Sequence, residues 1–430
     1  MQRVLSVLLT AILVLAVPVP LAAQKFLPKT IQFKGDPEYS DQELLAAAGL
    51  KKGTVLTSAE MNEHSKRLMD TGVFDTLTFK FDGVDLTFTL VPSATLYPIR
   101  LENLPLMPGK DLDAVLHDRF PLYHGKVPAE GGLLDDVRAA LEEMLAAQGI
   151  KASVTATPAG SLGSRKLSAM SFAIASPPVR VGALHLVGVS DSMQARVKLV
   201  ADHTMGTSFD TGHSKGNLEQ AFASFYADEG YAAVKVHVAQ AGSPVATADA
   251  IDVPFAVTIE EGRLYKLGAI HLPPDALVSQ ADLDKVAGAR AEGPAKGMIL
   301  RSTWGMIASR YKSKGFLDCA VTPHPEFDEG SGTVSYTVGI NPGPVYHLAF
   351  VKFENVSDEM RSRLMRVWQM LPGDPFDESY VSNFVVRAQK EDPVLQRSLA
   401  GVKVSFDVHA DQQTHDVNCV LHFARMQPVS

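Results

Sequence analysis

One strand-and-helix pattern recurs five times along this chain, at intervals of roughly 80 residues. Each repeat opens with a short apolar strand, which is followed by a helical pattern, a glycine-bearing loop, a second helical pattern and two more strands. The opening strands occupy residues 30–33, 97–101, 181–186, 267–272 and 348–353. This periodicity predicts an array of small units, in which each unit contacts mainly its neighbours.

The first repeat shows how the residues specify the pattern. Ser40 with Glu43, and Thr57 with Glu60, form two capping boxes, in which paired side chains satisfy free backbone N–H groups at the start of a helix. An Asp-Gly pair at 82–83 is a strong signal for a hairpin turn. We therefore expect two helices, followed by antiparallel strands at 76–81 and 85–90.

Glycine ends the second helical pattern in four repeats, and an apolar residue follows it. Glycine readily takes the left-handed conformation that stops a helix and lets the next apolar residue pack back onto it. The four glycines are Gly72, Gly149, Gly230 and Gly315. The fifth repeat departs from this pattern, because its second helix runs into Glu391-Asp392-Pro393 instead. It still closes with two alternating strands, at 402–408 and 417–423.

These patterns predict an α+β fold, a tandem array of five β-α-α-β-β units, each a three-stranded sheet with two helices on one face. The layout, the segment 68–74 and the junction segments 259–265 and 340–346 resemble the POTRA (polypeptide-transport-associated) repeat. The resemblance covers about residues 28–426. The expected repeats are 28–93, 94–178, 179–263, 264–343 and 344–426.

The resemblance implies a role in handling other proteins. In the family, arrays of these repeats usually precede an outer-membrane β-barrel that inserts or translocates proteins. The residues after Gly343 are used by the fifth repeat, and eight membrane strands of about ten residues each would not fit beside it. We therefore expect a repeat array that lacks a barrel of its own.

The first 23 residues are typical of a secretory signal peptide. Arg3 precedes a mostly apolar run, 4–17, which is too short to span a bilayer as a helix, and the small pair Ala22-Ala23 follows. We expect cleavage after Ala23, which makes residues 1–23 the signal peptide, and export to the periplasm. We expect no transmembrane segment in the mature chain, and association with the outer membrane is left open.

Charge and cysteine content exclude several classes of protein. The formal net charge of −8 argues against nucleic acid as a partner, because phosphate binding needs a basic face. The two cysteines cannot supply a disulfide scaffold or a four-thiolate zinc site. Cys419 alternates with Val417 and Leu421, which predicts a small core residue. Nothing in the sequence predicts a cofactor, a metal or a small-molecule substrate.

Two motifs carry weaker hypotheses. Residues 212–216 match the G-x-S-x-G nucleophile elbow around Ser214, but a polar, turn-like segment precedes them where that motif needs a strand. The polar residues His409, Asp411, His415 and Asp416 lie near the final hairpin turn. They could meet around a metal ion, although polar residues at an exposed turn are the commoner explanation.

Unpaired strand edges are the candidate binding sites. An open edge can take an extended peptide as an additional strand, held by main-chain hydrogen bonds. The resemblance implies that the second strand of each repeat is the edge, and Pro323 and Pro325 agree, because proline is tolerated at an edge. The proline-free edges supply the candidate partner-binding residues Val234, Lys235, Val236, His237, Val238, Thr76, Thr78, Lys80, Lys403 and Ser405. In the third repeat, we expect the valines to face the helices and Lys235 and His237 to lie on the open face.

We therefore predict a non-enzymatic periplasmic scaffold or chaperone module that acts in outer-membrane protein assembly or secretion. It would bind extended segments of other proteins by β-strand addition, and its partners would be unfolded outer-membrane clients or a separate barrel or assembly component. One alternative is a structural envelope adaptor with one fixed folded partner, whose edges are merely solvated or masked. A remote alternative is a secreted serine hydrolase that uses Ser214.

Overall fold

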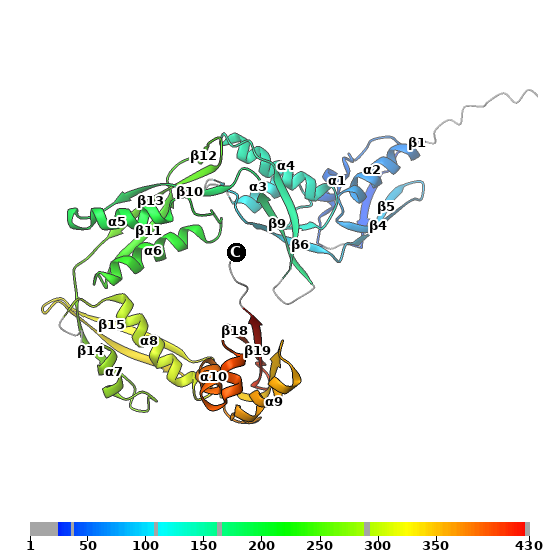
Figure 1. Cartoon of the computed structure of the whole chain (residues 1–430). Coiled ribbons are helices and arrows are strands. Elements are labelled where there is room, and N and C mark those ends of the chain that lie inside the picture. The colour runs from blue at the N-terminus through cyan, green and yellow to red at the C-terminus, as the bar shows by residue number, and fades with distance from the viewer. Residues whose placement is uncertain (1–24, 36–37, 107–110, 161–165, 288–292, 426–430) are drawn as a thin grey trace, which may run out of the picture. The chain divides into compact units, whose positions relative to one another are not determined.

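The computed structural model describes residues 25–35, 38–106, 111–160, 166–287 and 293–425 (Figure 1). The predicted signal peptide, residues 1–23, lies outside these residues. Within them, five sheets share one strand order, in which the third strand of each repeat lies between the first and the second. The α+β class is therefore confirmed. No helix in these ranges is both long enough and apolar enough to cross a membrane.

The first two repeats build their sheets from parallel first and third strands and an antiparallel second strand. The elements of the first repeat are β2 (Thr30–Lys34), α1 (Asp41–Ala48), α2 (Ser58–Asp70), β4 (Phe74–Phe81) and β5 (Asp85–Pro92). Those of the second are β6 (Leu96–Leu101), α3 (Leu112–Arg119), β7 (Lys126–Pro128), α4 (Gly132–Ala147), β8 (Val154–Gly160) and β9 (Leu167–Ile174).

The other three repeats follow the same order of strands. The third contains β10 (Val179–Val187), α5 (Asp191–Thr204), α6 (Ser214–Asp228), β11 (Lys235–Gln240), β12 (Val245–Ala246) and β13 (Ile251–Glu260). The fourth contains β14 (Lys266–His271), α7 (Gln280–Ala287), α8 (Gly297–Lys312), β15 (Ala320–Asp328) and β16 (Thr333–Asn341). The fifth contains β17 (His347–Glu354), α9 (Asp358–Val367), α10 (Glu378–Glu391), α11 (Pro393–Ser398), β18 (Val402–Ala410) and β19 (Asp416–Arg425).

The predicted local signals are confirmed. Both capping boxes are formed, with Ser40 paired to Glu43 and Thr57 paired to Glu60. The Asp82 carboxylate accepts the N–H groups of Val84 and Asp85, which stabilises the predicted hairpin turn. The four helix-ending glycines all have positive φ.

The fourth and fifth repeats each bury an apolar cluster between helices and sheet. In the fifth repeat, Leu364 of α9, Phe384 of α10 and Leu421 of β19 belong to one buried cluster. Cys419 is fully buried in the same cluster, which confirms that it is a core residue. In the fourth repeat, Ile307 of α8 belongs to a corresponding cluster.

Some elements differ from the sequence prediction. The fifth repeat has a further helix, α11, because Asp392 caps the N–H groups of Val394 and Leu395 and Pro393 occupies the first turn. A two-stranded sheet pairs β1 (Lys25–Phe26) with β3 (Leu56–Thr57), and β7 and β12 extend the second and third sheets. These short strands are made by tertiary pairing, and their sequences carry no strand pattern of their own.

The chain forms two compact units, and their division passes through the elements of the third repeat. The first comprises the residues up to His185 together with Met205–Lys215 and Gln240–Phe255. The second comprises Leu186–Thr204, Gly216–Ala239 and Ala256–Ser430.

In the second unit, helix-ending glycines join successive repeats. The carbonyl of Gly230 accepts the N–H of Tyr265 at 3.0 Å, and that of Gly315 accepts the N–H of Tyr346 at 2.8 Å. A Cβ on Gly315 would lie 2.9 Å from the Tyr346 carbonyl oxygen. Glycine is therefore needed at this junction for its left-handed φ and also for the close approach of the next repeat.

Candidate protein-binding strand edges

The second strand of each repeat lies at an edge of its sheet, as predicted. These edge strands are β4, β8, β11, β15 and β18. An antiparallel edge strand turns the N–H and C=O groups of alternate residues toward its partner strand and those of the intervening residues outward. The turn that closes each hairpin therefore decides which residues can receive an additional strand.

In β4, the outward groups belong to the apolar residues. The Asp82 N–H donates to the Asp85 carbonyl at 3.2 Å, so these two residues form a hydrogen-bonded pair at the turn. The register from Phe81↔Leu86 to Thr76↔Val91 is continuous. Alternation then turns the backbone of Thr76, Thr78 and Lys80 toward β5. The outward backbone groups are those of Leu77, Phe79 and Phe81.

In β18, too, the hairpin turn decides which backbone groups point outward. The Asp411 N–H donates to the Asp416 carbonyl at 2.8 Å, and the register to β19 continues without a shift. Lys403 and Ser405 therefore bond to β19, and their exposed side chains cover the open face. The outward residues are Val402, Val404, Phe406, Val408 and Ala410. The Val402 N–H already donates to the Leu399 carbonyl, so the available outward donors belong to the other four.

Two edges are covered by glutamates from the second helix of their own repeat. Glu142 of α4 accepts the Val154 N–H of β8 at 2.8 Å. Glu219 of α6 accepts the Val238 N–H of β11 at 3.0 Å. Each carboxylate occupies an outward donor that a client strand would need. No local pattern in the sequence marks a helical glutamate that reaches a strand edge, so these two contacts are visible only in the structure.

Proline removes donors from two edges. Pro323 and Pro325 lie opposite Val338 and Tyr336 in the β15–β16 ladder, and proline has no N–H to donate. In β8, Pro158 shares the alternation of Val154, so this edge lacks one outward donor and has another covered. These strands are poor acceptors of an additional strand.

The third-repeat edge differs in part from its prediction. β11 begins at Lys235, so Val234 lies outside the strand, and its N–H donates to the Tyr231 carbonyl in the preceding turn. The predicted facing is confirmed: Val238 is fully buried and Val236 half-buried, whereas Lys235 and His237 are exposed. Lys235 also pairs with Glu260 at 3.5 Å.

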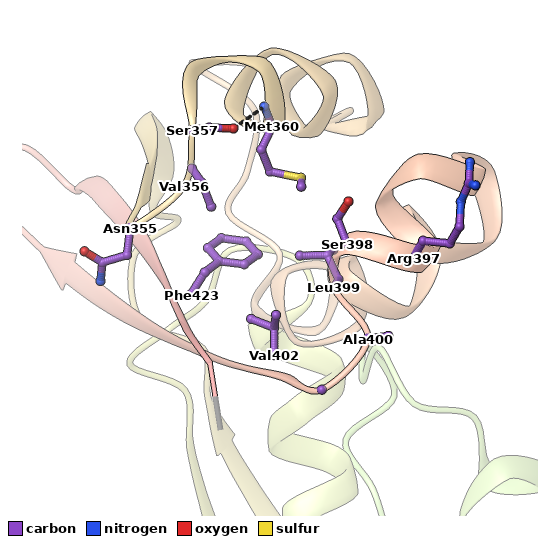
Figure 2. Close-up of a pocket in the computed structure, with 11 residues that line it drawn as sticks. Asn355, Val356, Ser357, Met360, Arg397, Ser398, Leu399, Ala400, Val402 and Phe423 are labelled. Carbon is purple, nitrogen blue, oxygen red and sulfur yellow. Dashed lines mark hydrogen bonds between the residues drawn. The ribbon is translucent and has the colours of Figure 1, made fainter. Parts of the chain in front are cut away.

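A pocket of about 620 Å³ adjoins the beginning of β18. Figure 2 shows apolar side chains gathered around it, which come from α9, from the residues just before α9 and just after α11, and from β18 and β19. They are Val356, Met360, Leu399, Val402 and Phe423. Ser357 caps α9 by accepting the Met360 N–H at 3.2 Å. Polar side chains, those of Asn355, Ser357, Arg397 and Ser398, also line the pocket.

The nucleophile-elbow context is not present around Ser214. Ser214 is the first residue of α6, and turn residues precede it where the motif needs a strand. Its Oγ is buried and accepts the Asp210 N–H at 2.7 Å. His213 bonds instead to the Asp210 carboxylate at 2.8 Å, so Ser214 acts as a local structural residue.

The final hairpin turn is organised by backbone contacts. The Asp411 carboxylate accepts the N–H groups of Gln413 and Thr414. The centroid of the His415 ring lies 5.3 Å from that of the Tyr346 ring. Within the described ranges, the group of side chains close enough to share a metal ion lies elsewhere, at Glu43, His117 and His124.

The described chain is thus a tandem array of small α+β modules with open sheet edges, the class of protein that the repeat pattern predicts. Residues 29–93 match the family model POTRA, described as a surface antigen variable number repeat, which confirms the predicted resemblance in the first repeat.

Similar solved structures include domains of BamA and Omp85 proteins. BamA POTRA3-5 of Haemophilus influenzae is 15% identical, with a TM-score of 0.41, over 57% of this chain and 96% of that one. The N-terminal domain of Omp85 from Thermosynechococcus elongatus is 16% identical, with a TM-score of 0.21, over 59% and 99%. POTRA1-3 of Omp85 from Anabaena is 16% identical, with a TM-score of 0.23, over 59% and 97%.

Proposed function

We propose that this chain is a non-enzymatic, periplasmic protein-binding module that acts in outer-membrane protein assembly or secretion. It binds extended segments of client proteins by strand addition at β4 and β18. The observation that carries this proposal is the contrast among the edges: β4 and β18 keep successive outward donors, whereas glutamate or proline removes donors from β8, β11 and β15. The POTRA match of residues 29–93 supports a role in handling other proteins.

The β18 edge is the better-defined acceptor. Val404, Phe406 and Val408 each present an N–H and a C=O outward, on a strand of 9 residues. Each main-chain hydrogen bond contributes a net stabilisation of about 0.5–1.5 kcal/mol. Several such bonds give weak binding with little sequence selectivity, which suits a module that meets many unfolded clients.

The neighbouring pocket adds a preference to that binding. A client strand that runs along β18 passes Val402, whose side chain lines the pocket. We expect clients to place an apolar or aromatic residue there, because Met360, Leu399 and Phe423 contribute apolar surface to the pocket (Figure 2). This contact supplies selectivity that main-chain bonds alone do not provide.

A structural adaptor with one folded partner is the second candidate. The edges β8, β11 and β15 favour this candidate, because carboxylates and prolines at a sheet edge oppose pairing with another strand. The two candidates differ in their clients: the first binds unrelated extended peptides, and the second does not.

The test compares two substitutions at one position. Val404→Pro removes an outward N–H, and Val404→Ala removes most of the same side chain but keeps that N–H. The edge strand of the fourth repeat, β15, already contains a proline, Pro323, so an edge strand of this fold accommodates one. Binding of a fluorescent peptide of alternating valine and threonine is measured by anisotropy, and folding is followed by circular dichroism.

We expect Val404→Pro to bind roughly 2- to 12-fold more weakly than Val404→Ala, since one hydrogen bond is lost. Equal affinities of the two folded variants would contradict strand addition at β18. If the parent itself does not bind the peptide, the adaptor becomes the better explanation.

A further inference from the structure

Three metal-ligating side chains from two repeats converge in the first compact unit. Glu43 lies on α1, His117 on α3, and His124 in the segment between α3 and β7. The Glu43 Oε1 atom lies 2.9 Å from His124 Nε2 and 3.7 Å from His117 Nε2. One ligand atom from each residue lies within 4.8 Å of the other two.

These separations fit a tetrahedral ion. With metal–ligand bonds of about 2.0–2.1 Å, neighbouring ligand atoms of a tetrahedral zinc site lie roughly 3.3 Å apart. The two distances from the carboxylate lie on either side of that value. The histidine nitrogens lie within 4.8 Å of each other, so the two rings would have to approach by at most roughly 1.5 Å to bring all three atoms into coordinating positions.

Neighbouring groups already orient the ligands. Ser40 donates its backbone N–H and its hydroxyl to Oε2 of Glu43, both at 2.7 Å, which leaves Oε1 facing the histidines. His117 Nδ1 lies 2.9 Å from the Tyr123 carbonyl, so Nδ1 carries the hydrogen and the Nε2 lone pair is available. The His124 ring packs against the Tyr39 ring, with 4.7 Å between the ring centroids.

Charge and access also suit a cation. The site combines one carboxylate with two imidazoles, a donor set that divalent transition metals accept. The side chains of Glu43, His124 and His117 are 21%, 27% and 44% exposed. An ion can therefore enter from solvent.

We propose that Glu43, His117 and His124 form a binding site for a divalent transition metal, with Zn²⁺ the best match to two imidazoles and one carboxylate. Three protein ligands leave a fourth position for water or for a side chain of a bound protein. Because the donors belong to the first and second repeats, the ion links α1 to α3. Metal binding then stabilises the contact between these repeats, since the unfolded chain has no such site.

The test uses the whole mature chain with Co²⁺ and Zn²⁺ as probes. Co²⁺ in a site of this kind gives visible absorption bands, and Zn²⁺ should displace it. The variants are Glu43→Gln, His117→Ala and His124→Ala. Glutamine can replace glutamate in the capping box with Ser40, so Glu43→Gln preserves the start of α1.

His422→Ala is the matched control. The two ring nitrogens of His422 face different carboxylates, Glu354 at 3.2 Å and Asp407 at 3.0 Å, so this histidine is equally engaged with acidic groups but cannot chelate with them. Circular dichroism without metal establishes that each variant is folded before it is titrated.

We expect one equivalent of Co²⁺ to bind to the parent and to His422→Ala. Loss of an outer-shell partner of a metal ligand typically weakens metal binding by about 10- to 100-fold. Each substitution of a ligand itself should weaken Co²⁺ binding by at least as much. The proposal is overturned if the parent shows no saturable binding of one equivalent, or if folded Glu43→Gln and His124→Ala bind as the parent does.

Discussion

Gly72 and Gly149 form a matched pair that separates backbone strain from the contact between repeats. Both end the second helix of a repeat, with φ of 76° and 83°. Both donate their N–H to a carbonyl three residues earlier, at 3.0 and 2.9 Å. They differ in their surroundings: a Cβ on Gly72 would lie 2.5 Å from the Glu130 carbonyl oxygen, whereas one on Gly149 would meet nothing within 4 Å.

The expected costs follow from this difference. Alanine at a left-handed position costs about 1–2 kcal/mol, which is the whole expected effect of Gly149→Ala. Gly72→Ala has the same backbone cost and a second one, because the new Cβ displaces the backbone of the second repeat. Overpacking of this kind costs about 1–3 kcal/mol. We therefore expect Gly72→Ala to cost about 2–5 kcal/mol in total.

Hydrogen exchange followed by mass spectrometry measures each effect in its own helix. Tryptophan fluorescence is unsuitable, because both tryptophans, Trp304 and Trp368, lie in the last two repeats. At about 1.4 kcal/mol per tenfold, Gly149→Ala should speed exchange in α4 by roughly 5- to 30-fold. Gly72→Ala should speed exchange in α2 by roughly 30- to several thousand-fold. Equal losses of protection would refute the argument from the contact between repeats.

Four further outcomes are expected. Burial raises the pKa of Glu43, but hydrogen bonds from Ser40 and His124 outweigh burial and lower the pKa from its ordinary 4.5 to about 2. The stabilisation from this ionised carboxylate is therefore present above pH 4.5 and lost as the pH falls to about 2. Acid unfolding followed by circular dichroism should be less steep in Glu43→Gln, and an unchanged profile would count against this. Burial raises the pKa of the Cys419 thiol to about 12, so in a Cys319→Ser variant Ellman's reagent at pH 8 should label it only after urea is added. Rapid labelling of this native variant would show that the Cys419 thiol is accessible. A fragment of residues 179–430 should fold by itself, as modular repeats require, and an unfolded fragment would show that the predicted boundary at 178 is misplaced. Ser214→Ala should lower stability by about 1 kcal/mol through the lost bond to the Asp210 N–H; esterase activity in the parent that this variant lacks would instead revive the hydrolase alternative.

The sequence alone was sufficient for the order of elements and for most of their ends. Capping boxes, helix-ending glycines and the Asp-Gly turn act over three or four residues, so their partners are visible in the sequence itself. The alternation that buries Val238 and exposes His237 is likewise a local property of a strand. The helix α11 was missed, although Asp392 followed by Pro393 is a recognisable helix start.

Only the tertiary structure decided which edges remain open. Glu142 and Glu219 cover strand donors 12 and 19 residues away, and that reach depends on how each helix packs on its sheet. Glu43 and His124 are separated by 81 residues and meet only because two repeats are in contact. Interactions within one turn of chain are determined by neighbouring residues, whereas these contacts depend on the packing of whole elements, which no local pattern in the sequence encodes.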